Sequence, residues 1–229
     1  MEMTATIQPH QPGTRHGFTL IELMVVVGIM GLITLFALPA FRGASRGGNL
    51  RAASLQLNSV LGLARQTSIS TRQEVSVLFP GTDPLINYTD GNRHLAYRGY
   101  ALYGEKDEEY LSEWRELPQG VVFSPNPDSP VPETASQRSV FMQSADYEKS
   151  VDFPRMDGTG VFDDQDMMAL TFRPDGALQP ADRRITIFVT DGYVDLTGTP
   201  TLVPRENATV LGLEVSPVTG QPRVREYAP

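Results

Sequence analysis

The chain has 229 residues, of which 40% are hydrophobic, and it carries a formal net charge of −8 at pH 7. A surface this acidic is a poor general binder of nucleic acid or of anionic lipid. The sequence has no cysteine, which excludes disulfides and thiolate metal sites, and only three histidines, which leaves few candidates for a catalytic base.

A long apolar run stands near the N-terminus. From Phe18 to Phe41 the chain reads FTLIELMVVVGIMGLITLFALPAF, which is 24 residues and therefore enough to span a bilayer as a helix. The apolar core of a conventional signal peptide is shorter, about 7–15 residues. Glu22 is the one charged residue in the run, and a carboxylate at membrane depth costs roughly 2.5–3.5 kcal/mol. We therefore expect Glu22 to have a partner and a function.

Small residues and a proline interrupt the same run. Gly28 and Gly31 leave a notch in the helix surface, and Pro39 removes a backbone hydrogen-bond donor near the end of the run. These residues predict a helix that packs closely and bends. Glycine and proline are also common in membrane helices of every kind, so this interpretation stays open.

The charges that flank the run bear on its orientation. Arg15 precedes the run, and Arg42, Arg46 and Arg51 follow it. Counted alone, these arginines place the C-terminal domain in the cytoplasm by the positive-inside rule. They therefore count against a periplasmic domain.

A second helical pattern follows the run. Apolar residues recur at steps of three and four, with polar residues between them, as on a helix with one buried face. They are Leu50, Ala53, Leu57, Val60, Leu61 and Ala64. Asn49 is a candidate N-cap or joint at the start of this segment. Together the two patterns predict one long helix, with a membrane half over residues 18–41 and an amphipathic half over residues 42–72.

From residue 73 onward the pattern is that of strands. Val75, Val77 and Phe79 alternate with their neighbours in a strand that ends at Pro80-Gly81. Further strands are predicted at Tyr97–Tyr103, Leu117–Phe123, Ala169–Arg173, Arg184–Thr190, Tyr193–Leu196, Thr209–Val215 and Arg223–Tyr227. Asp191-Gly192 predicts a hairpin turn between the fourth and fifth of these. A long N-terminal helix followed by strands predicts an α+β fold in which the helix packs on antiparallel sheets.

The middle of the chain departs from this pattern of alternating strands. The segment SPNPDSPVPETASQ, residues 124–137, has four prolines within eight residues and cannot be a central strand. From there to Asp166 the pattern is weak and acidic. We expect an exposed Pro-rich and acidic insertion at about 124–166, within a β-rich domain of residues 73–229.

The start of the apolar run has a recognisable pattern. G-F-T-L-I-E-L at residues 17–23, followed by about 17 apolar residues, resembles the processing site of type IV prepilins and type II secretion pseudopilins. The resemblance implies a leader over residues 1–17, cleavage by a prepilin peptidase between Gly17 and Phe18, and N-methylation of Phe18. It also implies that the leader faces the cytoplasm and the folded domain faces the periplasm.

Such a cleavage suggests a partner for Glu22. It creates an α-amine with a pKa of about 8, which is largely protonated at neutral pH. Glu22 lies four residues after Phe18, so in a helix the two groups share one face. The resemblance implies that this glutamate acts in assembly with a neighbouring subunit. The sequence leaves open whether the pair forms within one subunit or between two.

Three later segments resemble the GspH/FimT class of minor pseudopilins and minor pilins. They are WRELPQGVVF (114–123), ALTFRPDGAL (169–178) and TGQPRVREY (219–227). This resemblance implies a helix packed on two antiparallel sheets, a place near a filament tip, and contacts with other pilins, pseudopilins and minor tip subunits. Secretion and pilus versions share these motifs, so the sequence does not separate them.

Two features resemble sites of other chemistry. GASRG at residues 43–47 matches the G-x-S-x-G pattern of serine hydrolases, but a membrane helix stands where the nucleophile elbow needs a strand. Asp163, Asp164 and Asp166 offer oxygen ligands for calcium, but they lack the spacing of an EF-hand. No catalytic residue, metal or cofactor is predicted.

Arg223 and Arg225, in GQPRVR, resemble arginines of the DNA-uptake members of the FimT branch. A DNA-binding uptake subunit is therefore one alternative, although the negative domain argues against nucleic acid as a partner. A membrane-anchored periplasmic protein unrelated to filaments is another. The sequence as a whole predicts a non-enzymatic minor pseudopilin or minor pilin, with a single span in the bacterial inner membrane and a periplasmic domain.

Overall fold

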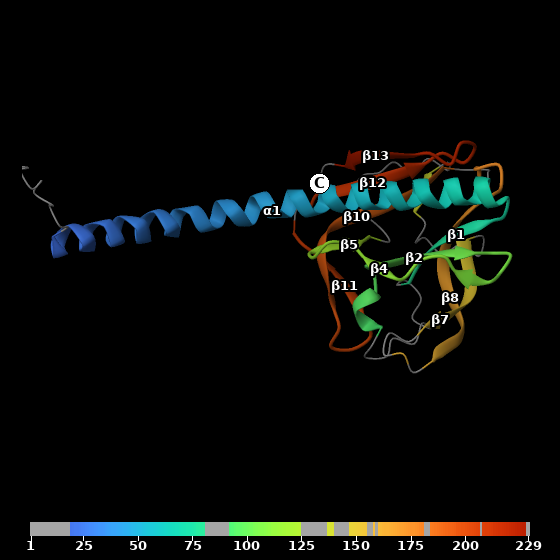
Figure 1. Ribbon diagram of the computed structural model, residues 1–229, viewed down its shortest axis with the longest axis horizontal. Coiled ribbons are helices and arrows are strands. Elements are labelled where there is room, and N and C mark those ends of the chain that lie inside the picture. The colour runs from blue at the N-terminus through green and yellow to red at the C-terminus, as the bar shows by residue number, and fades with distance from the viewer. Residues whose placement is uncertain are drawn as a thin grey trace, which may run out of the picture. The chain divides into compact units, whose positions relative to one another are not determined.

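A computed structural model describes residues 19–80, 92–124, 137–139, 147–154, 158, 160–180, 184–206 and 208–227, with the backbone alone for residues 35–47 and 137–139. The chain divides into two compact units, Met1–Ala44 and Ser45–Pro229. Helix α1, Leu20–Thr71, runs through both of them (Figure 1). Its 52 residues confirm the prediction of one long helix.

The amphipathic half of α1 buries the face that its sequence predicted. All six apolar positions are at most 9% exposed, namely Leu50, Ala53, Leu57, Val60, Leu61 and Ala64. Three of the six have alanine or valine, and these short side chains let the helix approach the sheets closely. In the unit Ser45–Pro229 this part of α1 lies along the strands (Figure 1).

In the described part of the chain the strands form two sheets. The seven-stranded sheet has the order β3-β2-β1-β8-β7, with β4 beside β2 and β9 beside β8. Its strands are β1 Val75–Phe79, β2 Gly99–Gly104, β3 Glu109–Tyr110, β4 Arg115–Glu116, β7 Glu148–Pro154, β8 Val161–Phe172 and β9 Leu178–Gln179. A short 3-10 helix, Arg93–Leu95, precedes β2.

The six-stranded sheet has the order β11-β10-β12-β13, with β5 and β6 also beside β10. Its strands are β5 Val121–Phe123, β6 Gln137–Ser139, β10 Arg184–Asp195, β11 Thr201–Pro204, β12 Val210–Val215 and β13 Pro222–Tyr227. Among the described residues, the strands of both sheets pair antiparallel, except that β6 pairs parallel with β10. The α+β class and the antiparallel sheets are therefore confirmed.

The main core joins α1 to both sheets. Leu57 and Leu61 from the helix meet Val77 from the first sheet and Leu213 from the second in one cluster of buried side chains. The rings of Phe79 and Phe123 link the sheets directly, edge to face, with centroids 5.3 Å apart. A second cluster lies on the other face of the first sheet and includes Leu78, Phe153 and Met167.

The predicted hairpin at Asp191-Gly192 is wrong. Strand β10 continues from Arg184 through both residues to Asp195, and its turn follows later, before β11. Gly192 is needed for a different reason. A Cβ there would lie 2.9 Å from both the Val122 side chain and the Val203 carbonyl oxygen, so only glycine lets β5 and β11 approach β10 so closely.

The structure also differs from the expected exposed insertion at 124–166. Residues 148–154 and 161–172 pair as β7 and β8, and Val151 and Phe153 are at most 3% exposed. Val151 and Phe153 alternate with exposed neighbours along β7, and the extra residue of the register shift between them lies on β8, between Phe162 and Gln165. The proline-rich residues 125–136 lie outside the described residues.

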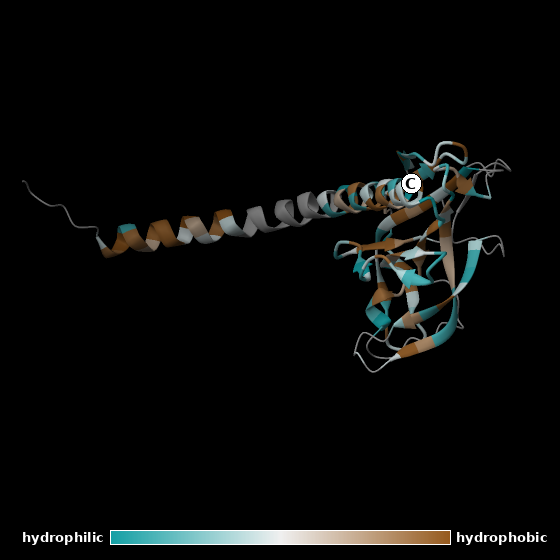
Figure 2. Ribbon diagram, turned by 45° about the vertical axis from the view of Figure 1, so that its right-hand side comes forward, coloured by the Kyte–Doolittle hydropathy of each residue, from teal (hydrophilic) through white to brown (hydrophobic). Residues whose placement is uncertain are grey.

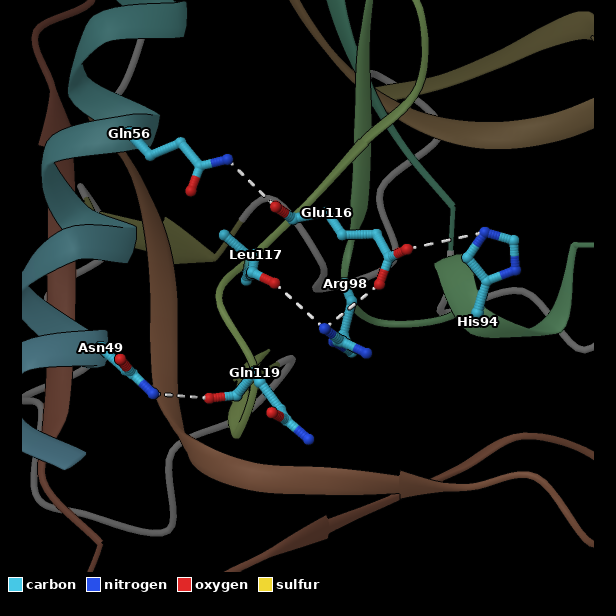
Figure 3. Close-up of polar contacts among 7 residues, drawn as sticks. All are labelled: Asn49, Gln56, His94, Arg98, Glu116, Leu117 and Gln119. Carbon is cyan, nitrogen blue, oxygen red and sulfur yellow. Dashed lines mark hydrogen bonds and ion pairs between the residues drawn. The ribbon is translucent and has the colours of Figure 1, made fainter. Parts of the chain in front are cut away.

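Polar contacts fasten α1 to the end of β4 and to the segment that connects β4 and β5 (Figure 3). Asn49 Nδ2 donates to the Gln119 carbonyl and Gln56 Nε2 donates to the Glu116 carbonyl, each at 3.0 Å. Asn49 therefore lies inside the helix as a tie to the domain and does not begin the helix, as an N-cap would. The Arg98 guanidinium holds the same segment through the Glu116 carboxylate at 3.2 Å and the Leu117 carbonyl at 3.1 Å.

We predict that Leu57→Ala lowers the free energy of unfolding by about 2–5 kcal/mol, because it removes a fully buried side chain between helix and sheets. The matched control is Leu55→Ala, on the same helix but 63% exposed, which should change that free energy by less than about 0.5 kcal/mol. Urea denaturation of the full chain in detergent, followed by the fluorescence of the single tryptophan, measures both. Equal effects would contradict this packing.

Candidate functional site

Glu22 lies in the first turn of α1. Its backbone N–H donates to the Thr19 hydroxyl at 3.3 Å, and the Leu23 N–H donates to the Thr19 carbonyl at 3.1 Å. Thr19 therefore caps the helix, and T-L-I-E is the S/T-x-x-E capping pattern with Glu22 at the third helical position. This cap was not among the predicted features, although the four-residue pattern stands in the sequence.

The other predicted features of this segment are only partly described. Gly17 and Phe18, the predicted cleavage site, lie outside the described residues. Glu22 makes no ion pair with any residue that the structure describes. The proposed pairing of Glu22 with a new α-amine therefore stays a prediction.

The first half of α1 is apolar on all sides. Every large apolar side chain from Leu20 to Ile33 is between 42% and 77% exposed. Figure 2 shows this segment as mostly hydrophobic. A helix with this distribution needs an apolar environment around it, and each such side chain gains about 1.5–3 kcal/mol when fully buried. Within the described residues, no helix combines the length and the hydropathy needed to cross a membrane.

The two glycines of this segment lie on its open surface. A Cβ added at Gly28 or Gly31 would meet nothing within 4 Å, so both positions are accessible to a neighbouring helix. The backbone is helical at Pro39, whose side chain lies outside the described residues. The predicted flexibility at these three residues is untested.

The two candidate arginines of the C-terminal strand lie on the outer face of the six-stranded sheet. Ile185, Ile187, Leu213 and Val215 point into the main core, so their neighbours along β10 and β12 point the other way. Arg223 on β13 is the register partner of Glu214. These residues belong to an outer-face cluster around Glu214, made up of Arg184, Thr186, Glu214, Arg223, Arg225 and Tyr227.

Glu214 is the centre of this outer-face cluster. Its carboxylate is only 4% exposed and accepts from Arg225 Nε at 3.0 Å and from the Tyr227 hydroxyl at 3.1 Å, with the Arg184 guanidinium at 4.0 Å. Burial raises the pKa of the Tyr227 hydroxyl, and the hydrogen bond to the carboxylate raises it further. Arg225 is therefore committed to a buried partner, which weakens the interpretation of Arg223 and Arg225 as a pair of phosphate contacts.

The three aspartates considered for calcium do not converge. Asp163, Asp164 and Asp166 follow one another along β8. The Asp164 N–H donates to Asp152 Oδ1 at 3.2 Å, which ties β8 to β7. Among the described residues, no group of three or more acidic or histidine side chains is arranged to hold a metal ion.

The hydrolase-like motif GASRG does not form a nucleophile elbow. Residues 43–47 lie inside α1, so no strand precedes the serine and no sharp turn presents it. His94, the one histidine in the described residues, lies instead beside Glu116, with Nε2 at 3.6 Å from the carboxylate (Figure 3). Neither arrangement supports a nucleophile and its base.

Comparison with known proteins agrees with the N-terminal pattern. Residues 13–38 match the family model of the prokaryotic N-terminal methylation motif. No curated protein sequence matches the chain. Among solved structures, the type IV minor pilin FimU of Pseudomonas aeruginosa (strain PAO1) is similar, with 13% identity and a TM-score of 0.36 over 80% of this chain and 93% of that one. A structural likeness this weak carries no argument by itself.

The methylation motif stands at the start of α1, and α1 is followed by antiparallel sheets in an α+β fold. The N-terminal segment therefore carries the prokaryotic methylation motif, and the chain has the predicted order of a long helix followed by antiparallel sheets.

We predict that Glu214→Gln lowers the free energy of unfolding by about 1–2 kcal/mol, because it removes the charge that holds Arg225 and the end of β13. Glu226→Gln is the matched control, since Glu226 is exposed on the same strand and has no ion pair among the described residues. Thermal or urea unfolding of the full chain measures both variants. A larger loss for Glu226→Gln would contradict the role of the outer-face cluster.

Proposed function

We propose that this chain is a minor pilin or minor pseudopilin, made as a prepilin and assembled into a filament. Prepilin peptidase cuts it between Gly17 and Phe18, and Phe18 is then N-methylated. The segment Phe18–Phe41 holds it in the inner membrane, with the β-rich domain in the periplasm, until it joins a type II secretion pseudopilus or a type IV pilus near the tip.

One observation carries this proposal. The methylation motif at residues 13–38 overlaps a helix whose large apolar side chains are exposed from Leu20 to Ile33. An apolar helix of this kind has to be surrounded by lipid or by other helices. A pilin needs both environments in turn, first the membrane and then the filament core. The accessible surface at Gly28 and Gly31 suits close packing against a neighbouring helix.

Two energies, the gain from the helix dipole and the cost of membrane burial, indicate how Glu22 acts. In the first helical turn the carboxylate gains about 0.3–1 kcal/mol from the helix dipole. Placing a carboxylate at membrane depth costs roughly 2.5–3.5 kcal/mol, so the helix terminus alone does not offset that cost. A protonated α-amine on a neighbouring subunit supplies the missing partner. Entry into the filament is then favoured because it neutralises a charge that lipid does not.

The remaining features support a structural subunit and no chemistry of its own. The hydrolase-like motif lies within a helix, and the outer-face cluster uses Glu214 to hold Arg225. A DNA-uptake subunit would instead need its arginines free for phosphates. We expect salt-sensitive DNA retention to be unchanged by Arg223→Ala combined with Arg225→Ala.

We predict that Gly17→Trp leaves residues 1–17 attached, because a bulky side chain blocks the cut before Phe18. Mass spectrometry of the N-terminal peptide from native membranes measures this, and the unaltered chain should give a methylated peptide that begins at Phe18. Gly48→Ala is the control, because a Cβ there meets nothing within 4 Å, and it should be processed normally. Normal processing of Gly17→Trp would remove the prepilin proposal.

We predict that Glu22→Ala leaves processing intact and lowers incorporation into filaments by about tenfold or more, as expected for the loss of one ion pair in an apolar environment. The measurement is the ratio of filament-bound to membrane-bound protein in sheared filament fractions. Glu22→Asp should restore part of the loss, because it keeps the charge. Full incorporation of Glu22→Ala would contradict the role assigned to this carboxylate.

A further inference from the structure

A small pocket lies at one end of the outer-face cluster of the six-stranded sheet. Its volume is about 170 Å³, and its polar lining consists of Arg184, Glu214, Ser216, Thr219, Gln221 and Arg223. These residues come from the start of β10, from β12, from β13 and from the turn 216–221 that joins β12 to β13. We call this the arginine pocket, because Arg184 and Arg223 are its exposed charged groups.

The arginine pocket has more positive charge than its one carboxylate neutralises. Glu214 is already paired with Arg225 at 3.0 Å and with the Tyr227 hydroxyl at 3.1 Å. Arg184 lies 4.0 Å from the same carboxylate, which is the outer limit of an ion pair, and 55% of its side chain is exposed. The Arg223 side chain makes no ion pair or hydrogen bond with any residue that the structure describes. Three arginines therefore share one carboxylate, a local charge of +2 in a chain whose net charge is −8.

The turn 216–221 adds hydroxyl donors to the pocket. The Ser216 hydroxyl accepts from the Thr219 N–H at 3.3 Å, and the Thr219 hydroxyl accepts from the Gln221 N–H at 3.4 Å. Because both oxygens act as acceptors in these contacts, each hydroxyl keeps its hydrogen for another partner. Next to Glu214 on the same face, Thr186 is 1% exposed and its hydroxyl has no hydrogen-bond partner among the described residues. This end of the sheet is therefore rich in donors, which is the pattern of a site for an anion.

The size and the charge of the pocket select among anions. A volume of about 170 Å³ is below the ~300–1,000 Å³ of pockets that hold whole ligands, so the pocket fits the end of a side chain and not a nucleotide. The net charge of −8 repels a polyanion such as DNA, whereas it matters little for one carboxylate on a protein that other contacts hold nearby. The Glu214 carboxylate in the lining repels a doubly charged phosphate more than a singly charged carboxylate. Arginine also matches a planar carboxylate with paired N–H donors.

We propose that the arginine pocket receives an aspartate or glutamate side chain from a different subunit that adjoins this chain in the filament. The carboxylate lies between Arg184 and Arg223 and also accepts from the hydroxyl groups of the turn 216–221. Charge complementarity of this kind sets the choice and the orientation of a partner more than the strength of binding.

This contact deepens the proposed function and rests on it. One copy of this chain is enough to form the contact, as a minor subunit beside other subunits requires. The contact also depends on the folded sheet, because Arg184 and Arg223 come from β10 and β13 and meet only when both strands flank β12. The neighbour of the β-rich domain is then a subunit with an exposed carboxylate at the point of contact.

The test is site-specific cross-linking of the full chain in native membranes, with a photoreactive residue in place of Gln221, which is exposed in the lining. Mass spectrometry identifies the cross-linked peptide. We expect a peptide of a different subunit, with an aspartate or glutamate at or next to the cross-linked position. Arg184→Gln combined with Arg223→Gln should lower the cross-linked fraction by about tenfold, because it removes both charged donors.

A charge swap then tests the pairing itself. The identified carboxylate of the partner is replaced by lysine, and Arg223→Glu is made in this chain. Each change alone should lower the cross-linked fraction by about tenfold, and the two together should restore it.

A control variant removes the same charge elsewhere. Arg72→Gln combined with Arg115→Gln changes two exposed arginines outside the pocket and should leave the cross-linked fraction unchanged. The fluorescence of the single tryptophan checks that every variant is folded.

Competition separates a carboxylate site from a phosphate site. Inorganic phosphate or a duplex DNA oligonucleotide is added at an ionic strength matched with sodium chloride, so that general screening is the same. Neither should lower the cross-linked fraction. Displacement by either one, or a cross-link to lipid or nucleic acid, would make the pocket a phosphate site and overturn the proposal.

The contact is also wrong if no other subunit is cross-linked, if the paired glutamine variant has no larger effect than its control, or if the charge swap brings no recovery. Processing and filament incorporation are measured in the same cells. If they are normal while the swap fails, the docking contact is wrong and the pilin function stands. If residues 1–17 remain attached, the pilin function fails first.

Discussion

The packing of one helix face against two sheets is the constraint on which the rest of this domain depends. Leu57, Leu61, Ala53 and Ala64 are fully buried, and both sheets contribute to the same cluster. Phe79 and Phe123 meet edge to face between the two sheets within the same cluster. The polar ties at Asn49 and Gln56 then fix the position of the helix along the sheets.

Positive and negative charges are concentrated in different segments of the chain. The segment between Glu22 and Glu74 has five arginines and no carboxylate, while residues 105–113, 148–154 and 160–166 contain ten carboxylates and two lysines. By the positive-inside rule the arginines that follow the apolar run argue for a cytoplasmic domain, which conflicts with the periplasmic orientation that we propose.

Helical features were predictable from sequence to a greater degree than the sheet details. Six apolar positions of α1 follow from periodicity, because a helix face is a local property. The hairpin predicted at Gly192 is wrong because the role of this glycine depends on its contacts with β5 and β11, and β5 is distant in sequence. The pairing of Arg225 with Glu214 joins neighbouring strands in the same way. The Thr19 cap, by contrast, is a local feature, and its T-L-I-E pattern could have been predicted from the sequence.

The apolar helix alone cannot decide between membrane and filament. Leucine and valine side chains are as well accommodated by lipid tails as by other helices, so moving them from one to the other gains little. The difference in free energy between membrane and filament has to come from groups that are unfavourable in lipid or that lipid does not contact. Glu22 is such a group within the apolar segment. In the assembly that we propose, this one charged side chain gives direction to a helix that is otherwise apolar.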